Sequence, residues 1–377
     1  MSEYKIIISG GGTGGHIFPA IAIADAFVER HPDTQILFVG ADNRMEMERV
    51  PRAGYKIVGL PVSGFDRRRL HKNFAVIMRF LKSLRIAKRI IRDFAPDIVV
   101  GTGGYASAPT LWAASSLKIP TLIQEQNSYA GITNKLLARR ASTICVAYED
   151  MEKYFPENKI VFTGNPVRKE LESCRIDRMS AISHFGLKPY LKTVLVIGGS
   201  LGARSINDGI RNRLKQLAEA KVQVIWQTGK NYYANIKREL EQSEAKEFIY
   251  CADFIAEMEY AYAAADLVVS RAGAGSISEL CLQGKPSILV PSPNVAEDHQ
   301  TKNANAVAEH NAAIMLADKY ADIHLTDSIL KHIHNNSLLE MLRNNIHSMG
   351  VSKSAKLIVN EMEKLTDKTV DVWMQKQ

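Results

Sequence analysis

The chain has 377 residues, 46% of them hydrophobic, which is enough to bury two cores of ordinary domain size. Its 48 lysines and arginines outnumber its 40 acidic residues, but one segment without acidic residues accounts for the net charge of +8. Charge concentrated in this way argues against a protein wrapped generally by nucleic acid and predicts one anionic surface or partner. The cations of this basic segment are Arg67, Arg68, Arg69, Lys72, Arg79, Lys82, Arg85, Lys88, Arg89 and Arg92.

The four cysteines lie far apart and form no CxxC pair, so they predict neither a disulfide framework nor a zinc knuckle. A reduced, cytosolic compartment is the expectation. The first residues enter a strand-like run without the pattern of a signal peptide, and no uncharged apolar run reaches the ~18 residues that a membrane-spanning helix needs. We therefore expect a soluble or peripheral protein.

Short apolar runs alternate with longer helical patterns along the whole chain, which is typical of parallel βαβ units with helices on both faces of the sheet. The predicted fold class is therefore α/β. The strands expected in the first half are Lys5–Ser9, Gln35–Val39, Lys56–Leu60, Asp97–Val100, Thr121–Gln124, Thr143–Val146 and Ile160–Thr163. Those expected in the second half are Thr193–Ile197, Val222–Gln227, Glu247–Cys251, Leu267–Ser270, Ser287–Val290 and Ala313–Leu316.

Turn-forming residues at Gly164–Arg168 indicate a domain connection between these two sets of strands. We expect one domain over residues 1–165 and a second over residues 166–351. A helical pattern from Ser352 to Leu365 predicts a C-terminal helix, and we expect the segment 352–377 to pack back on the first domain.

Three glycine-rich turns, Gly10–His16, Gly101–Tyr105 and Gly198–Ala203, each follow a predicted strand. Glycine tolerates positive φ and lets the backbone approach a ligand, while the N-terminus of the following helix offers free N–H groups to an anion. The first and third turns are too far apart to open one nucleotide-binding fold. Two such folds facing each other are therefore predicted.

Gly10, Gly12 and Gly15 also satisfy the GxGxxG spacing of dinucleotide-binding folds. Asp42, the nearest acidic candidate for a ribose, neither secures nor excludes an NAD-dependent oxidoreductase. His16 follows the glycines directly, where its imidazole could face a bound ligand. An unperturbed histidine pKa of roughly 6.5 suits a general base, and a capping or solvent-facing histidine is the alternative.

The segment Arg271–Glu279 opens another helix after a predicted strand, and its small residues leave room for a nucleotide base or a phosphate. Glu279 can accept two hydroxyl hydrogen bonds, as ribose recognition requires, but its spacing from Ser276 equally matches a capping box. The polar run Glu297–Ala304 suits sugar hydroxyls or a plain solvated helix start. No D-x-D pair offers ligands for a divalent ion, so helix N-termini and Arg168 would neutralise a diphosphate.

The basic segment carries a helical apolar pattern, which an ordinary domain helix would bury in the core. Its stripe comprises Ile77, Leu81, Leu84 and Ile91, with Phe80, Ala87 and Ile90 beside it. The uncompensated cations, among them Arg79, Lys82 and Arg85, predict an additional role at an anionic membrane surface, where each charge is worth on the order of 1 kcal/mol.

Together these motifs resemble one family, the bacterial N-acetylglucosaminyltransferases that convert lipid I to lipid II in peptidoglycan synthesis. The resemblance runs in order through nearly the whole chain and is far more specific than any single glycine turn. Its motifs are GGTGGH at 11–16, GGY at 103–105, QEQN at 124–127, GNPVR at 164–168, GGS at 198–200, the segment 271–279 and DHQ at 298–300.

The resemblance implies a glycosyltransferase-B fold, two Rossmann-like domains around a cleft, and a reaction without metal or cofactor. It places the protein at the cytoplasmic face of the inner membrane, with other cell-wall synthesis and division proteins as further partners and no nucleic acid. Donor UDP-N-acetylglucosamine would contact Thr13, Gly14, Gly15, Asn127, Arg168, Ser200, the backbone of Ile255, Ala274, Gly275, Ser276, Glu279 and Gln300. The undecaprenyl-diphosphate-linked muramoyl pentapeptide would approach 11–16 and Gly103, Gly104 and Tyr105. Leu201 replaces a glutamine of many relatives, which puts a side-chain contact with the donor there in question.

In the implied reaction a base removes the proton of the muramoyl 4-hydroxyl, the oxygen attacks the anomeric carbon, and UDP leaves from the opposite face with inversion. His16 is the candidate base and Glu125 its rival. A UDP-N-acetylglucosamine 2-epimerase, similar in fold and donor, is the alternative function. A nucleic-acid-binding role for the basic segment leaves the glycine turns unexplained, and the segment lacks the interleaved aromatics of a stacking platform.

Overall fold

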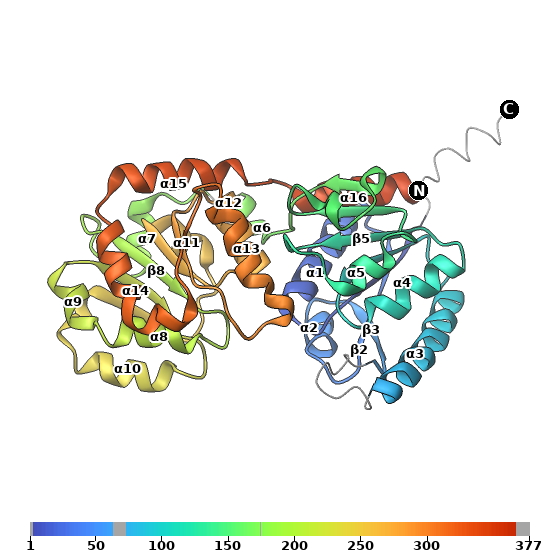
Figure 1. The fold of residues 1–377 in the computed structure, drawn as a ribbon, viewed down its shortest axis with the longest axis horizontal. Helices are drawn as coiled ribbons and strands as arrows, with labels where there is room; N and C mark the ends of the chain where they lie inside the picture. The colour runs from blue at the N-terminus through green and yellow to red at the C-terminus, as the bar shows by residue number, and fades with distance from the viewer. Residues whose placement is uncertain (1–2, 63–72, 174, 367–377) are drawn as a thin grey trace. The chain divides into compact units, whose positions relative to one another are not determined.

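The computed structural model describes residues 3–62, 73–173 and 175–366. The chain divides into two compact units, of which unit 1 comprises Met1–Val167 with Lys353–Gln377 and unit 2 comprises Arg168–Ser352. The first connection therefore falls inside the turn-rich segment 164–168. Each unit holds one parallel sheet with helices packed on its faces (Figure 1), so the predicted α/β class is confirmed.

The sheet of unit 1 has seven strands in the order β3-β2-β1-β4-β5-β6-β7. Ile6, Ile7 and Ile8 of β1 are fully buried because helices cover both faces of the strand. The strand order reverses between β1 and β4, and the loops that follow such a pair of strands diverge and leave room for a ligand. The strands are β1 (Lys5–Gly10), β2 (Gln35–Ala41), β3 (Lys56–Leu60), β4 (Ile98–Gly103), β5 (Thr121–Glu125), β6 (Thr143–Val146) and β7 (Ile160–Phe162).

The C-terminal helix α16 packs against α1 in unit 1. Ile358, Val359 and Met362 of α16 join Phe27 of α1 in one buried cluster. Glu363 also pairs with the side chains of Arg30 and His31 at 2.7 Å each. The helices of unit 1 are α1 (Gly14–Arg30), α2 (Glu46–Arg52), α3 (Asn73–Phe94), α4 (Ser107–Ser116), α5 (Ile132–Leu137) and α16 (Ser354–Thr366).

The sheet of unit 2 has six strands in the order β10-β9-β8-β11-β12-β13, which puts a second reversal between β8 and β11. Its core is built around the fully buried rings of Trp226 and Tyr262. The strands are β8 (Thr193–Ile197), β9 (Gln223–Gln227), β10 (Ile249–Ala252), β11 (Leu267–Ser270), β12 (Ser287–Leu289) and β13 (Ile314–Met315). The helices are α6 (Lys169–Glu172), α7 (Arg178–His184), α8 (Arg204–Arg211), α9 (Leu214–Glu219), α10 (Tyr233–Glu241), α11 (Met258–Ala264), α12 (Ala274–Leu282), α13 (His299–Ala308), α14 (Asp318–His332) and α15 (Asn336–Ser348).

Every predicted strand is present, and several predicted boundaries differ from the observed ones by one to three residues. The strand expected to end at Val100 continues to Gly103, because Gly101 pairs with β1 and β5 in the ladder. The strand expected to begin at Glu247 begins at Ile249, since a 3₁₀ helix over Glu244–Phe248 precedes it. The second glycine turn therefore starts at Gly104, three residues later than predicted.

The basic segment is described only from α3 onward, and Arg67, Arg68, Arg69 and Lys72 lie outside the described residues. Within α3 the predicted core stripe is wrong at two positions, since Ile77 is 47% exposed and Leu81 is 45% exposed. Ile91 and Ala87 are buried as predicted, and Val76 and Ser83 complete the buried face. No described helix is long and apolar enough to cross a membrane.

Candidate active site

The turns that follow β1 and β4 are joined backbone to backbone in unit 1. Gly11 N donates to the carbonyl of Gly103 at 3.3 Å, and a Cβ on Gly104 would lie 2.2 Å from the Gly11 oxygen. Gly104 has a φ of +88°, so both the conformation and the close approach require glycine there. Two motifs that are distant in sequence, 11–16 and 103–105, therefore form one loop cluster, with the exposed side chain of Tyr105 at its edge.

The N-terminus of α1 supplies donors to this cluster. Thr13 is the N-cap residue and its side chain makes no capping hydrogen bond, so the first amides of the helix, on Gly14 and Gly15, have no partner within the helix. Such amides, at the positive end of a helix dipole, suit a phosphate group. The structure thus puts three of the predicted donor contacts where an anion can reach them.

A buried carboxylate behind the first turn was not foreseen. Glu46, at the start of α2, is fully buried, and it accepts hydrogen bonds of 3.0 Å from the amides of Gly12 and Ala41. One amide of the glycine turn is therefore already satisfied within the protein. No local pattern links Glu46 to a turn more than thirty residues earlier, so sequence reasoning had no signal for it.

His16 is held in place and is not a capping residue. Its Nδ1 lies 2.9 Å from Oε1 of Gln126, and its partly buried ring packs so closely on Gly103 that a Cβ there would lie 2.9 Å from the ring. Thr102 Oγ1 also donates to the His16 carbonyl at 2.8 Å. The predicted base therefore stands at the loop cluster with a defined ring orientation.

Glu125, the rival base, is 1% exposed and accepts four hydrogen bonds. Its Oε1 accepts from the backbone and side-chain amides of Asn127 at 3.1 and 3.2 Å, and its Oε2 accepts from Gly131 N at 3.0 Å and Asn134 Nδ2 at 2.8 Å. Both oxygens hold the loop after β5 in shape. This geometry favours a loop-holding role for Glu125, and it directs the amides of Asn127, a predicted donor contact, toward Glu125.

In unit 2 the corresponding turn, Gly198–Ala203, leads into α8. Ser200 and Leu201 are exposed at its tip, and Ala203, the N-cap residue, offers no side chain to the helix amides. Gly202 has a φ of +82°, and a Cβ there would lie 2.1 Å from the Thr228 carbonyl oxygen. The turn is thus packed against the loop that follows β9.

Gln227, at the end of β9, ties this turn to the loop that carries Ile255. Its Nε2 donates to the Gly199 carbonyl at 3.2 Å, and its Oε1 accepts from Ile255 N at 2.9 Å. The backbone of Ile255 was predicted to contact the donor. A ligand that uses the Ile255 N–H must first displace Gln227, which leaves the carbonyl of Ile255 as the simpler contact.

Glu279 and Arg168 were predicted separately and lie together in unit 2. Glu279 is the sixth residue of α12, so neither it nor Ser276 can form the capping box that their spacing suggested; Gly273 is the N-cap residue. The Glu279 carboxylate pairs with Arg168 Nε at 3.1 Å and accepts from the Tyr262 hydroxyl at 2.9 Å. Burial raises the pKa of Glu279, while the Arg168 charge and the Tyr262 hydrogen bond offset part of that rise.

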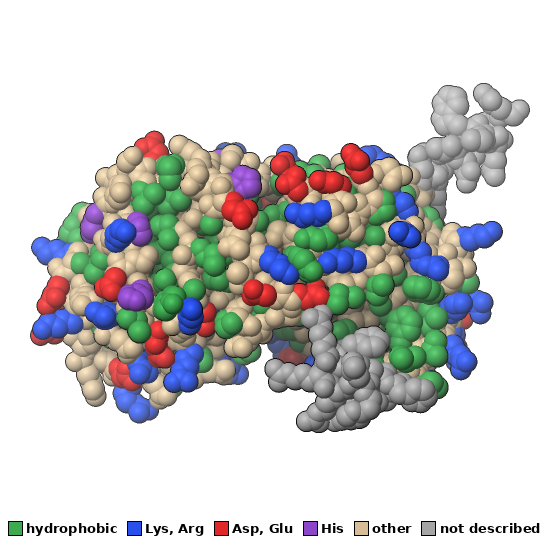
Figure 2. Space-filling model, viewed as in Figure 1, with side chains coloured by type: hydrophobic (Ala, Val, Ile, Leu, Met, Phe, Trp, Pro, Cys, Tyr) green, Lys and Arg blue, Asp and Glu red, His purple; other side chains and the backbone are tan. Residues whose placement is uncertain are grey.

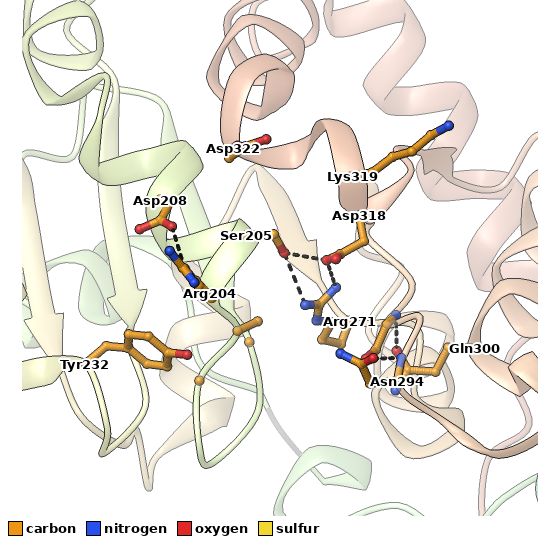
Figure 3. A pocket seen from close by; sticks show the side chains of 14 residues that line it. Arg204, Ser205, Asp208, Tyr232, Arg271, Asn294, Gln300, Asp318, Lys319 and Asp322 are labelled. Carbon is orange, nitrogen blue, oxygen red and sulfur yellow. Dashed lines mark hydrogen bonds and ion pairs between the residues drawn. The ribbon is translucent and has the colours of Figure 1, made fainter. Parts of the chain in front are cut away.

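A pocket of about 650 Å³ opens beside the turn Gly198–Ala203 (Figure 3). Arg271, just after β11, donates to Asp318 Oδ1, to Ser205 Oγ at 3.2 Å and to the Val290 carbonyl at 3.0 Å. Figure 3 shows these side chains pointing toward one another across the pocket. Asp318 opens α14, and its link to Arg271 has no counterpart in sequence pattern.

Gln300, the predicted contact for the sugar hydroxyls, lines the same pocket. Its Oε1 accepts from Ser292 N at 2.8 Å, so the orientation of its amide is defined. Asp208, Asp318 and Asp322 also line this pocket, but within the described ranges no group of three or more His, Cys, Asp or Glu side chains is arranged to hold a metal ion.

Two family models match the chain, the glycosyltransferase family 28 N-terminal domain over residues 6–146 and the glycosyltransferase family 28 C-terminal domain over residues 193–360. The chain is 60% identical to the UDP-N-acetylglucosamine--N-acetylmuramyl-(pentapeptide) pyrophosphoryl-undecaprenol N-acetylglucosamine transferase of Parabacteroides distasonis, over 98% of this chain and 100% of that protein. It is 53% identical to the protein of the same name from Bacteroides thetaiotaomicron, over 97% of this chain and 98% of that protein.

Among solved structures, Acinetobacter baumannii MurG matches with a TM-score of 0.79 and 26% identity, over 96% of this chain and 100% of that chain. A UDP-GlcNAc 2-epimerase from Neisseria meningitidis matches with a TM-score of 0.63 and 15% identity, over 96% and 100%, which is a likeness of fold alone. The fold is the predicted glycosyltransferase-B fold. The family models and the full-length relatives agree, and the chain belongs to glycosyltransferase family 28, in the group of its UDP-N-acetylglucosamine--N-acetylmuramyl-(pentapeptide) pyrophosphoryl-undecaprenol N-acetylglucosamine transferases.

Proposed function

We propose that this chain transfers N-acetylglucosamine from UDP-N-acetylglucosamine to the 4-hydroxyl of a muramoyl pentapeptide carried on undecaprenyl diphosphate, forming lipid II. The observation that carries the proposal is the 60% identity, over nearly the whole chain, to a transferase named for these substrates. The geometry is consistent with it, since unit 1 presents a histidine beside amide donors, and unit 2 presents both a mostly buried carboxylate paired with Arg168 and a polar pocket.

We assign the nucleoside end of the donor to Glu279 and Arg168. Each carboxylate oxygen of Glu279 has one protein partner, so each retains a lone pair for a ribose hydroxyl. The uncapped start of α12, at Ala274, Gly275 and Ser276, supplies amides to the phosphates or the sugar. Ser200 and Gln300 complete the assignment at the diphosphate and at the sugar hydroxyls.

In unit 1 we assign Thr13, Gly14 and Gly15 to donor oxygens and Gly103, Gly104 and Tyr105 to the acceptor. The support is their joint position in one loop cluster with uncommitted helix amides. Asn127 belongs to the loop that Glu125 holds, and its assigned contact with the donor depends on that loop keeping its shape.

We assign His16 as the general base. It takes the proton of the muramoyl 4-hydroxyl while that oxygen bonds to the anomeric carbon, and the electrons of the broken glycosyl–oxygen bond leave with UDP. Attack from the face opposite UDP inverts the configuration. General-base catalysis of this kind contributes roughly 10²- to 10⁴-fold, and Glu125 is less suited because its four hydrogen bonds already occupy both oxygens.

We also propose that the protein works as a peripheral protein at the cytoplasmic face of the inner membrane and docks there through α3. Apolar side chains at 77, 78 and 81 are exposed beside Arg79, Lys82 and Arg85. Met78, Leu81 and the three cations line a hollow of about 500 Å³. Figure 2 shows hydrophobic and basic side chains gathered on this surface. Apolar insertion beside cations is the combination that binds anionic bilayers.

The transfer is tested by incubating the purified protein with UDP-N-acetylglucosamine and a short-chain lipid I analogue while UDP release and product mass are measured together. We expect a disaccharide product with one UDP for each transfer. Free N-acetylmannosamine would identify an epimerase instead, and UDP release without disaccharide would contradict the assigned acceptor.

The base assignment is tested by pH–rate profiles of His16→Ala and Glu125→Gln. Loss of His16 should remove the acid limb of the profile and most of the turnover, whereas Glu125→Gln should keep the limb. Near-normal turnover of His16→Ala contradicts the assignment.

A further inference from the structure

The amide of Gln126, which contacts His16, has a single permitted orientation. Gln126 is 2% exposed, and its Nε2 donates to the backbone carbonyls of Thr102 at 2.7 Å and Gln124 at 3.0 Å. A backbone carbonyl can only accept, so the group that faces both of them must be the NH₂. The other end of the amide, which faces His16, must therefore be the oxygen.

Two further buried amides enforce this orientation. The side-chain oxygen of Gln124 is a third acceptor for Gln126 Nε2, and Gln124 Nε2 donates to Asn165 Oδ1 at 2.8 Å. Asn165 Nδ2 donates in turn to the backbone carbonyl of Gln126 at 2.9 Å. Reversing any of these amides would set acceptor against acceptor in a buried site. The lost hydrogen bond could not be replaced there by one to water.

We propose that Gln126 is a positioning residue that holds neutral His16 as its Nδ1–H tautomer and so leaves Nε2 as the basic nitrogen. Gln126 Oε1 carries no proton, so its 2.9 Å contact with Nδ1 requires a hydrogen on Nδ1. A neutral imidazole has one N–H, which leaves a lone pair on Nε2. Among the described residues, Nε2 of His16 has no hydrogen-bond partner.

The same contact stabilises the product of proton transfer. When Nε2 accepts a proton, the Nδ1–H bond to Gln126 becomes charge-assisted and strengthens. The orienting partner here is a neutral amide, so it selects the tautomer without adding a negative charge beside the ring. This inference rests on the proposed role of His16 as the base. It adds to the catalytic machinery three amides whose orientation is fixed by their hydrogen bonds and which are not assigned to contact substrate.

The tautomer can be measured without substrate by ¹⁵N NMR of the full-length protein labelled at histidine, with the His16 signals assigned from a His16→Asn spectrum. We expect the Nδ1–H form in the unmodified protein. Gln126→Leu removes the acceptor and should convert His16 largely to the Nε2–H form, with kcat roughly 10- to 100-fold lower and the KM for UDP-N-acetylglucosamine nearly unchanged.

Two companion variants separate positioning from simple loss of packing. Gln124→Leu removes a buried glutamine from the same network but leaves Gln126 bound to two carbonyls, so the Nδ1–H form should persist. Gln126→Glu keeps an acceptor toward Nδ1 but turns its second oxygen toward the Thr102 and Gln124 carbonyls, so the Nδ1–H form should persist with a lower Tm than that of the parent protein.

The outcomes distinguish this inference from the proposed function. An Nε2–H tautomer in the unmodified protein, or an Nδ1–H tautomer that survives in Gln126→Leu, overturns the role of Gln126 whatever the activity. Full turnover in His16→Ala overturns the base assignment even where the NMR result stands.

Discussion

The Tyr262 hydroxyl donates a 2.9 Å hydrogen bond to Oε2 of Glu279, on the side of the carboxylate that Arg168 does not occupy. Tyr262 is fully buried, and burial together with Glu279 raises its pKa well above the ordinary value, so it acts as a permanent donor. The carboxylate assigned to the ribose is therefore oriented from two directions.

Replacing Tyr262 by Phe should weaken donor binding with little effect on kcat. Loss of a hydrogen bond worth about 1 kcal/mol corresponds to a rise in KM for UDP-N-acetylglucosamine of roughly fivefold. Steady-state kinetics with varied UDP-N-acetylglucosamine measure this KM. Tyr260→Phe on the same helix is the control, because the Tyr260 ring stacks on His184 and not on Glu279. Equal KM values for the two variants would remove the orienting role of Tyr262.

The raised pKa of Glu279 predicts a stability that changes with pH. Between the ordinary glutamate pKa and the raised value, the folded chain binds more protons at Glu279 than the unfolded chain does, so its stability falls as pH rises. The side chain of Glu279→Gln cannot ionise, so this variant does not lose stability at position 279 as pH rises. Its free energy of unfolding relative to the parent should therefore increase from acidic to neutral pH, as urea titrations at both would show.

Asp177→Asn is a control of opposite sign for that experiment. Hydrogen bonds from Ser180 lower the pKa of Asp177, so its contribution to stability is present above the ordinary aspartate pKa and is lost as pH falls through the lowered value. The Asn variant should lose stability relative to the parent as pH rises. If the free energy of unfolding relative to the parent changed with pH in the same direction for both variants, the raised pKa of Glu279 would be contradicted.

Gly104→Ala should separate the two turns of unit 1. The new Cβ would need to displace the Gly11 carbonyl, and a positive φ adds about 1 kcal/mol of strain for any residue with a side chain. Gly12→Ala is the matched control, with a φ of +84° and nothing within 4 Å of its Cβ. We expect a larger fall in Tm and in turnover for Gly104→Ala, and comparable falls would show that conformation alone requires glycine.

Gln227→Leu should raise the KM for UDP-N-acetylglucosamine because it frees the turn at Gly199 from the loop at Ile255. Breaking two hydrogen bonds worth about 1 kcal/mol each should raise the KM about 30-fold. Gln223→Leu is the control, since Gln223 is a buried glutamine at the other end of the same strand, where it bonds to Lys188 and Thr193. It should lower Tm and spare KM; a KM effect equal to that of Gln227→Leu would refute the bridging role.

Charge reversal of Arg79, Lys82 and Arg85 to Glu should reduce binding to vesicles that contain anionic lipid and spare turnover on a short-chain acceptor. Each near-surface charge is worth about 1 kcal/mol, so the triple variant should lose binding by at least about 100-fold. The control is a charge reversal of the same size on unit 2, away from α3, at the exposed residues Lys237, Arg238 and Lys246. Vesicle sedimentation that cannot tell the two triple variants apart would exclude α3 as the docking surface.

Much of the fold could be predicted from the sequence because its signals are local. A strand buried in a parallel sheet appears in the sequence as a short apolar run, and each glycine turn follows its strand directly. The strand at Ile6–Ile8 and the turn at Gly10–His16 could therefore be predicted together. The capping-box alternative at Ser276 and the predicted burial of Ile77 and Leu81 in α3 were wrong, because spacing does not say where a helix begins or which of its sides is buried.

The sequence by itself determined the two parallel sheets, the glycine turns and the family of this protein, since these depend on local pattern and on motif order. Only the tertiary structure decided which groups at those turns remain free for a ligand. Glu46 satisfies Gly12, Gln227 satisfies Ile255, Glu125 turns inward on its loop, and Gln126 orients His16. Each of these depends on a side chain meeting a specific backbone or ring atom, and such a match is set by three-dimensional packing and not by residue type or spacing.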